Sequence, residues 1–544
     1  MSWPTKKTPK KKNSGMISRL AVRGHRPWAV AFFLVFLAVS LLVLDDYGVS
    51  MDEAMQRDHG RVMLTWWSDR LGVTPHRLDK LYRAMPAYGM FMPATTLSFE
   101  IILGLQESQF AYFRLRHLLQ FLLFFGACVA FYRLLRYRWP ERKWIPLLGS
   151  AMLVLSPRIF AHAFFDPKDE VMLSLYTIAT YTLVRFLTRR TTESLLWHAV
   201  ATGIVLGSRQ ASVLIPMATL ALVAYQAVLE PQLRSKAWQL VPYAALSLVL
   251  GVFWNPYLYM GKGDGLARSL ANVTDYVQWD GMVLFAGEIL NPGTIPWYYL
   301  PQWIGLTTPL VYLPLGLTGA ILVTRRLFRA LGHLRLYAST TERTDLLIFA
   351  LTLLPLAAAI LLEARLYQGW RHLFFIYPGF IYLAVLGYTY YSRPWPRWTA
   401  GFVASGMLLT LLTMIRIHPH QQVYFNESVW YGPSLLDQYE LDFWGVSYRT
   451  AFEELARTIP SGERRLVKCH GWACMTNLRA LPPDIIDRFQ ETENWDAKGY
   501  FATEFYYPTH REFARERKDI FAHPVVEVAP DGHLIIGIYP GQLK

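Results

Sequence analysis

Cysteine and charged residues are both scarce in this chain of 544 residues. Three cysteines are too few for the disulfide framework of a small secreted domain. Charged residues make up 17% of the chain, against roughly 25% in soluble domains, whereas hydrophobic residues reach 53%. So few charges cannot cover a soluble surface of this size. The composition excludes a disordered, collagen-like or disulfide-rich protein and predicts a polytopic membrane protein.

Several familiar motifs are also missing. No glycine-rich phosphate loop of the Walker type occurs, so the sequence gives no support to an ATP-driven pump. No internal duplication relates two halves of the chain, as it does in many transporters. Cys469 and Cys474 lack two further ligands for a zinc site, and their spacing leaves a disulfide and two free thiols both open.

Long apolar runs fill the chain up to residue 415. A membrane span needs about 20 mostly apolar residues, and about eleven runs approach that length. The run at 27–44 is followed by Asp45-Asp46-Tyr47 instead of a small-residue cleavage site, so we expect a retained first helix. The other runs lie at 113–134, 144–161, 171–187, 195–208, 211–229, 238–254, 300–324, 344–362, 372–390 and 398–415.

Basic residues are concentrated in the first 26 residues and in every second loop between the runs. Lys and Arg number 54 against 40 Asp and Glu, a net charge of +14. The positive-inside rule places such segments in the cytoplasm, so this charge does not indicate a nucleic-acid partner. We expect a multi-pass protein of the cytoplasmic (inner) membrane with a cytoplasmic N-terminus. The segments that then face outward are 45–112, 162–170, 255–299, 363–371 and the tail from 416.

The tail has frequent charges and no run long enough to span a membrane. Helical spacing over Ser447–Ile459, a strand over Arg465–His470 and a hairpin over Val525–Tyr539 that turns at Pro530-Asp531-Gly532 predict a small α/β domain. The predicted organisation has three parts. They are a disordered, basic cytoplasmic N-terminus at 1–26, a mainly helical transmembrane module at 27–415 and an extracytoplasmic domain at 416–544.

An acidic pair, Asp52-Glu53, follows the first run and opens an amphipathic stretch that continues to Trp67. A carboxylate held at a membrane boundary suits a general base, because it can accept a proton from a neighbouring hydroxyl or amine. The alternative is a helix N-terminus at which acidic side chains complement the helix dipole.

A charged turn lies between the runs at 144–161 and 171–187. Asp166, Lys168, Asp169 and Glu170 crowd this turn, and such a group could bind a sugar hydroxyl, a phosphate or a cation. Alternatively, Asp-Pro is a common turn initiator, and Asp169 and Glu170 would lie at the N-terminus of the next span.

Basic residues at membrane depth form a third group. Arg209 has apolar neighbours on both sides, and a charge there is costly unless it faces a cavity or a partner. The guanidinium fork matches a phosphate, which makes Arg209, Arg365 and Arg371 candidates for binding one. Arg371 and His372 lie where a lipid headgroup would sit. The alternatives are snorkelling of Arg209 and interfacial anchoring by Trp370 and Arg371.

These motifs, in this order, resemble the GT-C glycosyltransferases, and within them the branch of protein O-mannosyltransferases and lipid A aminoarabinose transferases (glycosyltransferase family 39-like). The resemblance covers residues 27 to about 450. Asp166 and Phe443 stand where the family pattern has Asn and Tyr. Besides the acidic pair, the matching motifs are Phe164-Phe165-Asp166-Pro167-Lys168-Asp169, Arg371-His372, His418-Pro419, Tyr424-Phe425-Asn426-Glu427 and Glu440-Leu441-Asp442-Phe443-Trp444-Gly445.

The resemblance implies a GT-C type fold and an inverting transfer of a sugar from a polyprenyl-phosphate donor to a lipid, glycan or protein acceptor at the outer face. By position, Asp52 is the general base and Glu53 its neighbour, while Asp166 and Asp169 contribute to donor or acceptor binding. A glycosyl phosphate carries its own leaving group, so one carboxylate and cations that stabilise the departing phosphate suffice. No cofactor is expected. The acidic residues leave room for a divalent cation, but the resemblance implies a reaction without one.

Two other functions stay open on the sequence alone. A transporter or flippase of lipid-linked sugars would use the same cavity and arginines without needing a base. A non-catalytic accessory subunit would present the tail from 416 to 544, and its acidic residues would then have no chemical role.

Overall fold

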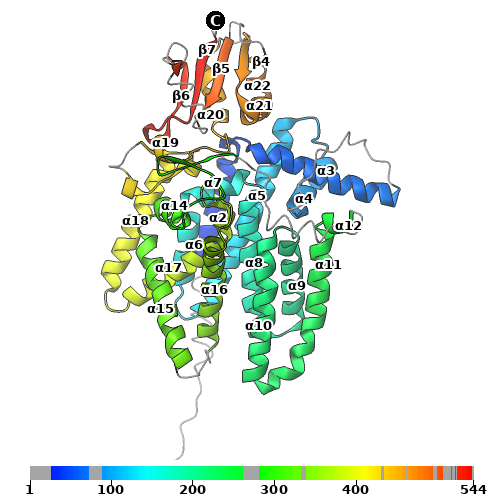
Figure 1. Ribbon diagram of the computed structural model, residues 1–544, viewed down its shortest axis with the longest axis vertical. Coiled ribbons are helices and arrows are strands. Elements are labelled where there is room, and N and C mark those ends of the chain that lie inside the picture. Colours follow the sequence, from blue (N-terminus) through cyan, green and yellow to red (C-terminus); the bar gives the residue numbers. More distant parts are fainter. Residues whose placement is uncertain are drawn as a thin grey trace, which may run out of the picture.

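The computed structural model describes residues 26–72, 89–260, 281–332, 339–429, 434–460, 462–493, 499–505, 516–517, 521 and 523–541. The predicted basic N-terminus lies outside the described residues, except for Arg26. Long helices form most of the structure, and a small sheet near the C-terminus lies at one end of the helical part (Figure 1). The mainly helical class with a small C-terminal α/β unit is therefore confirmed.

The long helices account for the membrane part. In the described part of the chain, eight helices are long and apolar enough to cross a membrane, or nine if a bent helix pair counts as one span. The chain is therefore a multi-pass membrane protein. The helices of this part, including those too short or too charged to count as spans, are α2 (Arg26–Leu42), α5 (Gln109–Arg138), α6 (Ile145–Val154), α7 (Pro157–Phe165), α8 (Asp169–Arg189), α9 (Thr192–Leu206), α10 (Leu214–Leu229), α11 (Leu240–Phe253), α14 (Tyr299–Thr307), α15 (Tyr312–Gly332), α16 (Thr340–Leu361), α17 (Tyr377–Tyr391) and α18 (Pro396–Arg416).

The predicted runs all coincide with helices, but within the described residues fewer helices than the eleven runs meet the length and composition of a span. The run at 195–208 forms α9, which has only 15 residues. The run at 300–324 divides into α14 and α15, and the second of these ends in several arginines. The run at 144–161 forms α6 and α7, which meet at an angle of 66°. Pro157 begins α7, and a proline cannot continue the hydrogen bonding of the preceding helix.

Two further helices lie across the end of the bundle, beneath the sheet (Figure 1). They are α3 (Met51–Leu71) and α4 (Phe91–Ile102), and α3 contains the predicted amphipathic stretch. Gly60 of α3 packs on the carbonyl of Pro93, where any Cβ would collide. Arg57 of α3 donates to the buried Glu100 of α4 with an Nε–Oε1 distance of 2.9 Å. These contacts fix the position of α3.

The sheet of the C-terminal unit has five strands in the order β4-β3-β5-β7-β6. Strand β3 runs parallel to β4 and β5, and β7 runs antiparallel to β5 and β6. The structure confirms the predicted helix as α20 (Tyr448–Thr458), the strand at 465–470 as β3, and the hairpin as β6 and β7. Cys469 and Cys474 form a disulfide. The remaining bounds are β3 (Arg465–Cys469), α21 (Gly471–Arg479), α22 (Pro483–Ile486), β4 (Phe489–Glu491), β5 (Gly499–Glu504), β6 (Val526–Val528) and β7 (Ile536–Gly541).

Short elements connect these parts of the chain. They include turns of 3-10 helix and a two-stranded ribbon of β1 and β2. Their bounds are η1 (Leu44–Asp46), η2 (Gln210–Val213), η3 (Pro231–Gln239), α12 (Tyr257–Met260), β1 (Val283–Phe285), β2 (Glu288–Leu290), η4 (Arg371–Ile376), η5 (Gln421–Val423), η6 (Glu427–Val429), α19 (Leu435–Gln438) and η7 (Pro530–Gly532).

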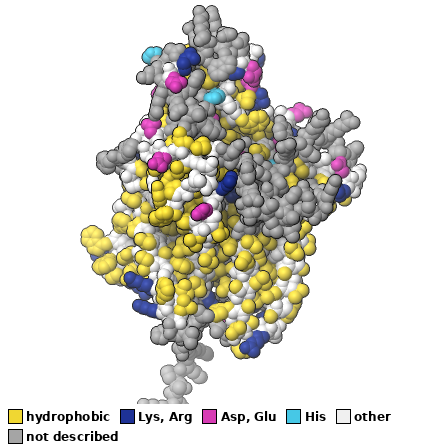
Figure 2. All heavy atoms as spheres, viewed as in Figure 1, with side chains coloured by type: hydrophobic (Ala, Val, Ile, Leu, Met, Phe, Trp, Pro, Cys, Tyr) yellow, Lys and Arg dark blue, Asp and Glu magenta, His cyan; other side chains and the backbone are white. Residues whose placement is uncertain are grey.

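Side chains on the surface differ between the two ends of the molecule. Figure 2 shows hydrophobic side chains over the helical part of this face. Among the coloured residues in view, Asp and Glu appear toward the sheet, where Lys and Arg are also seen, whereas at the opposite end only Lys and Arg are seen. This distribution is the one expected from the predicted sidedness, which stays a prediction.

Candidate functional site

The two members of the acidic pair make different contacts. Glu53 is fully buried, and its Oε2 accepts a hydrogen bond from the backbone N of Ser50 at 2.8 Å. The Nε2 of His117 on α5 lies 3.2 Å from the other carboxylate oxygen. This is the carboxylate half of a capping box at the start of α3. Glu53 therefore makes the contacts of a helix-capping residue, which was the alternative considered for this acidic pair.

Asp52 faces the charged turn before α8. Its Oδ2 lies 2.5 Å from Nζ of Lys168, and the residue is 9% exposed. Because successive residues of a helix point about 100° apart, Glu53 can cap α3 while Asp52 faces Lys168. Of the pair, Asp52 is the one placed among candidate substrate-binding residues.

Asp166 organises the charged turn from within. Its Oδ1 accepts hydrogen bonds from the backbone N atoms of Lys168 at 3.1 Å and Asp169 at 2.9 Å. Its Oδ2 lies 2.9 Å from Nδ1 of His162, and both side chains are fully buried. These contacts are typical of an aspartate that forms a turn. A turn at Asp-Pro was the alternative to substrate binding at this position. Substrate binding by Asp166 stays a prediction.

Asp169 brings together two of the predicted arginines. This first residue of α8 is buried, and one of its carboxylate oxygens pairs with Nη1 of Arg209. The other oxygen lies 2.6 Å from Nη1 of Arg371, whose Nη2 donates to Oε1 of Gln368 at 2.6 Å. Asp52 joins the same group through Lys168, the chain neighbour of Asp169. Residues from three separate predicted groups therefore form one cluster.

A small cavity opens beside this cluster and includes Lys168 and Arg209 in its wall. Its volume of about 20 Å³ has room for one water molecule. Gln56 of α3 also lines it, and Nε2 of Gln56 lies 3.2 Å from Nδ1 of His59. Burial, reinforced by the charge of Lys168, lowers the pKa of His59 to about 4, so its ring is neutral at pH 7. The remaining lining residues are Gly89, Met92, Pro93, Pro167, Val171 and Ser208.

The sequence interpretation missed Gln56 and His59 as site residues. They follow Asp52 at spacings of four and seven residues, which places all three on one face of a helix. That spacing is the signal that could have identified them. The same spacing is equally typical of a helix face in contact with water, and only the structure shows that this face meets Lys168.

Two motif residues near position 440 pack against Arg371. The rings of Trp444 and Phe443 lie 4.7 Å and 5.8 Å from the Arg371 guanidinium carbon. The Oδ2 of Asp442 accepts from the backbone N of Ser447 at 2.9 Å and so shapes the turn that holds these rings. Asn426 donates to the carbonyls of Gly305 and Thr308 at the end of α14. Phe443 and Trp444 therefore pack against the cluster, whereas Asn426 fixes its own segment to the end of α14.

Two predicted residues lie at the edge of the cluster or beyond it. His372 follows Arg371, and its ring packs edge-on against Tyr367 with 4.7 Å between ring centres. Arg365 is exposed and lies beside Gly293. Among the described residues, Arg365 has no ion pair with Asp169 or Asp52. Phosphate binding by Arg365 gains no support from this placement.

The four predicted carboxylates, at 52, 53, 166 and 169, make different contacts in the described structure. No group of three or more His, Cys, Asp or Glu side chains within the described ranges is arranged to hold a metal ion. Glu53 and Asp166 are each held by backbone N–H groups, and Asp52 and Asp169 are paired with cations. The carboxylates at 52, 53, 166 and 169 therefore do not converge on one point.

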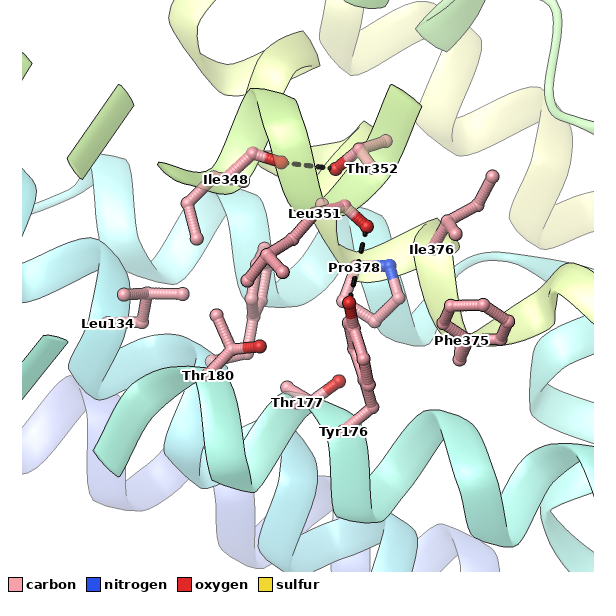
Figure 3. Close-up of a pocket in the computed structure, with 12 residues that line it drawn as sticks. Leu134, Tyr176, Thr177, Thr180, Ile348, Leu351, Thr352, Phe375, Ile376 and Pro378 are labelled. Carbon is pink, nitrogen blue, oxygen red and sulfur yellow. Dashed lines mark hydrogen bonds between the residues drawn. The ribbon is translucent and has the colours of Figure 1, made fainter. Parts of the chain in front are cut away.

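A second cavity lies deeper among the helices, between α5, α8, α16 and the start of α17 (Figure 3). It also measures about 20 Å³ and is lined mostly by apolar side chains. The Tyr176 hydroxyl donates to the carbonyl of Leu351 at 3.5 Å, and the Thr352 hydroxyl donates to the carbonyl of Ile348 at 2.7 Å. With these hydroxyl groups already bonded, the cavity is a small packing gap between helices.

The fold and the site define a multi-pass membrane protein with a buried cluster of ion pairs beneath a small C-terminal sheet. No protein-family model and no curated protein sequence matches the chain. Among solved structures, it is similar to ArnT from Cupriavidus metallidurans. The apo structure gives a TM-score of 0.46 and 13% identity, and covers 94% of this chain and 98% of that one.

Two other solved structures are similar over most of the chain. ArnT bound to undecaprenyl phosphate gives a TM-score of 0.47 at 13% identity, and covers 94% of this chain and 98% of that one. The Archaeoglobus fulgidus oligosaccharyltransferase in complex with Zn and sulfate gives 0.36 at 11% identity, over 84% of this chain and 65% of that one. At such scores and identities, this likeness assigns no residue role, donor or acceptor.

Proposed function

We propose that the protein is an inverting glycosyltransferase that moves a sugar from a polyprenyl-phosphate donor to an acceptor at the outer face of the cytoplasmic membrane. One observation carries this proposal. Lys168, which pairs with Asp52, is the chain neighbour of Asp169, which pairs with both Arg209 and Arg371. A candidate base and three cations therefore share one partly buried cluster.

The proposed reaction is a single displacement at the anomeric carbon of the sugar. The acceptor hydroxyl or amine attacks this carbon and transfers its proton to the carboxylate of Asp52. The bond between the anomeric carbon and the phosphate oxygen breaks, and its electron pair leaves with the polyprenyl phosphate. Lys168, Arg209 and Arg371 stabilise the negative charge that grows on the phosphate. Because the displacement occurs once, the anomeric configuration inverts.

The observed ion pairs suggest how the donor enters the cluster. Each of the three cations is paired with Asp52 or Asp169. The donor phosphate would compete with these carboxylates for the same cations. When Lys168 turns from Asp52 to the phosphate, the Asp52 carboxylate is released to accept the proton of the acceptor. Donor binding would thereby prepare the base.

The proposed lipid partner is a polyprenyl phosphate, because the cluster offers three cations to its phosphate group. Undecaprenyl phosphate, present in one ArnT structure, belongs to this lipid class. The proposed acceptor is an envelope glycolipid, a glycan or a protein. We place the N-terminus in the cytoplasm and the C-terminal unit outside, as the basic loops predict.

Mass spectrometry of cell-envelope glycoconjugates, with and without the protein, tests the proposal and identifies the acceptor. We expect one class of molecules to lose the mass of a single sugar when the protein is absent, and to regain it with the wild-type chain but not with Asp52→Asn. Purified protein in nanodiscs should then transfer that sugar from a polyprenyl-phosphate donor. Movement of the donor between leaflets without transfer would instead favour the transporter.

A further inference from the structure

The segment that leads into α3 is held by residues far along the chain. The Tyr47 hydroxyl donates to Oε1 of Gln421 at 2.8 Å, and the backbone N of Met51 donates to the carbonyl of Trp444 at 3.3 Å. Between these two anchors lies Val49, three residues before Asp52. Segment 47–51 therefore connects the C-terminal part of the chain to the proposed base.

Asn477 makes the most specific of these contacts. Its Oδ1 accepts from the backbone N of Val49 at 2.9 Å, and its Nδ2 donates to the carbonyl of Val49 at 2.8 Å. One side-chain amide thus satisfies both backbone groups of one residue, as an adjacent β-strand would. The same Nδ2 also reaches the carbonyl of Gly445 at 3.1 Å. Asn477 is 2% exposed and lies on α21 of the C-terminal unit.

The fit around this amide is tight. A Cβ on Gly48 would collide with the carbonyl of Val446 and with the Oδ1 of Asn477. Val49 is itself buried and packs with Tyr112 and Phe113 of α5. Because segment 47–51 cannot shift without breaking these contacts, its position depends on that of α21.

Trp444 contacts both the start of α3, which carries the proposed base, and Arg371, one of the cations. Its carbonyl accepts from Met51, and its ring lies 4.7 Å from the guanidinium carbon of Arg371. The Ser50 hydroxyl donates to the carbonyl of Phe165, in the turn that carries Lys168, at 2.7 Å. Contacts of this kind set the distance between the start of α3 and the ion-pair cluster.

We propose that Asn477 is a positioning residue for Asp52, and that the C-terminal unit serves to hold the start of α3 against the ion-pair cluster. This role rests on the proposed function. Asn477 touches neither donor nor acceptor in it. Loss of the amide would let segment 47–51 move, so the base would be misplaced while the cations stay where they are.

The test compares Asn477→Leu, which keeps a similar volume but cannot form these hydrogen bonds, with Thr476→Ala on the same helix. The Thr476 hydroxyl donates to the carbonyl of Trp472 within α21, so it serves as a matched control. We expect Asn477→Leu to lower kcat by up to about 10²-fold, the effect of a misplacement near 1 Å. The KM for donor and the affinity for polyprenyl phosphate should change less than about twofold, because the cation cluster is intact.

Hydrogen–deuterium exchange supplies a second readout. Backbone amides at 47–51 should exchange faster in Asn477→Leu than in the wild type, while those of β5 and β7 stay unchanged. If Asn477→Leu does not fold, Asn477→Ser is judged by the same readouts. Unchanged kcat and exchange in a folded variant would overturn the inference, as would equal losses of kcat and donor affinity. If the wild type transfers no sugar, the proposed function fails, whereas the exchange data still report whether Asn477 holds this segment.

Discussion

Lys168 and Asp52 form a buried ion pair, with 2.5 Å between Nζ and Oδ2. It joins the turn before α8 to the first turn of α3, two segments more than a hundred residues apart in the sequence. The pair matters because its two members have opposite tasks in the proposed reaction. Asp52 must accept a proton, and Lys168 must attract a phosphate.

The first prediction concerns Asp52. Asp52→Asn keeps the shape of the side chain but removes the proton acceptor, so kcat should fall by about 10²–10⁴-fold. Donor binding, measured with polyprenyl phosphate in nanodiscs, should change little. Asp58→Asn is the matched control, because Asp58 lies on the same helix with a partly exposed side chain that pairs with Arg61. Near-normal transfer by folded Asp52→Asn would exclude this residue as the base.

The second prediction concerns the arginines that share Asp169. Arg209→Ala and Arg371→Ala should raise the donor KM and lower kcat, because the charge on the leaving phosphate grows toward the transition state. Lysine at either position should restore only part of the activity, since it lacks the guanidinium fork. Arg365→Ala serves as the control, and an exposed arginine beside Gly293 should be dispensable. A result in which only Arg365→Ala impairs donor binding would contradict the proposed cluster.

The third prediction separates stability from activity. Asp345 on α16 is buried and pairs with Arg138 of α5 at 2.6 Å and Arg326 of α15 at 2.9 Å. Asp345→Ala would leave these partly exposed arginines without their carboxylate, which costs less than the roughly 3–5 kcal/mol lost when a fully buried pair is broken. We expect a lower apparent Tm in detergent, with kcat per folded molecule unchanged. Glu342→Gln, one turn earlier on α16, should leave both quantities at the wild-type level.

The fourth prediction is a pH dependence in the C-terminal unit. Burial, with the nearby charge of Asp442, raises the pKa of Glu504 from 4.5 to about 8. Between these values the folded protein holds a proton that the unfolded chain has released, so Glu504 makes the protein less stable as pH rises from 4.5 to 8. The slope from one such group is about 1.4 kcal/mol per pH unit.

Glu504→Gln should remove this contribution. Its apparent Tm should exceed that of the wild type at pH 8, and the gain should shrink as the pH approaches 4.5. Glu527→Gln, at an exposed position of β6, is the control. A gain in Tm that stays constant from pH 5 to pH 8 would mean that ionisation of Glu504 is not its cause.

The fifth prediction concerns sidedness. Reporter fusions after Leu44 and Arg416 should report an outer location, and fusions after Arg138, Arg190 and Arg329 should report the cytoplasm. The reason is the alternation of basic loops along the chain. A cytoplasmic signal from the fusion after Arg416 would place the C-terminal unit, and the cluster beneath it, on the wrong side for the proposed donor.

Most of the helices and several site residues could be predicted because their signals are local. An apolar run of span length forms a helix wherever it lies in the chain, and Arg209 is conspicuous because it interrupts one. The bend between α6 and α7 also has a local cause in Pro157, but the sequence interpretation treated 144–161 as one span. Among the described residues fewer helices than predicted runs meet the length and composition of a span, since α9 is short and α14 is separated from α15.

The roles within the site depend on contacts that no local pattern encodes. Asp52 and Glu53 are adjacent, and only the position of His117 and Lys168 shows that one caps the helix while the other faces the cations. The pairing of Asp169 with Arg371 joins residues 202 positions apart. Such separations leave no trace in hydrophobic periodicity or composition, so the sequence supplied candidates but not their partners.

The contact between Val49 and Asn477 spans 428 positions of the chain. During synthesis the start of α3 emerges long before α21, so segment 47–51 lacks this partner until more than 400 further residues have been made. A chain that stops before residue 477 would carry Asp52, Lys168 and both arginines, yet it would lack the amide that fixes the segment before α3. The order of translation thus delays completion of the site until α21 has been made.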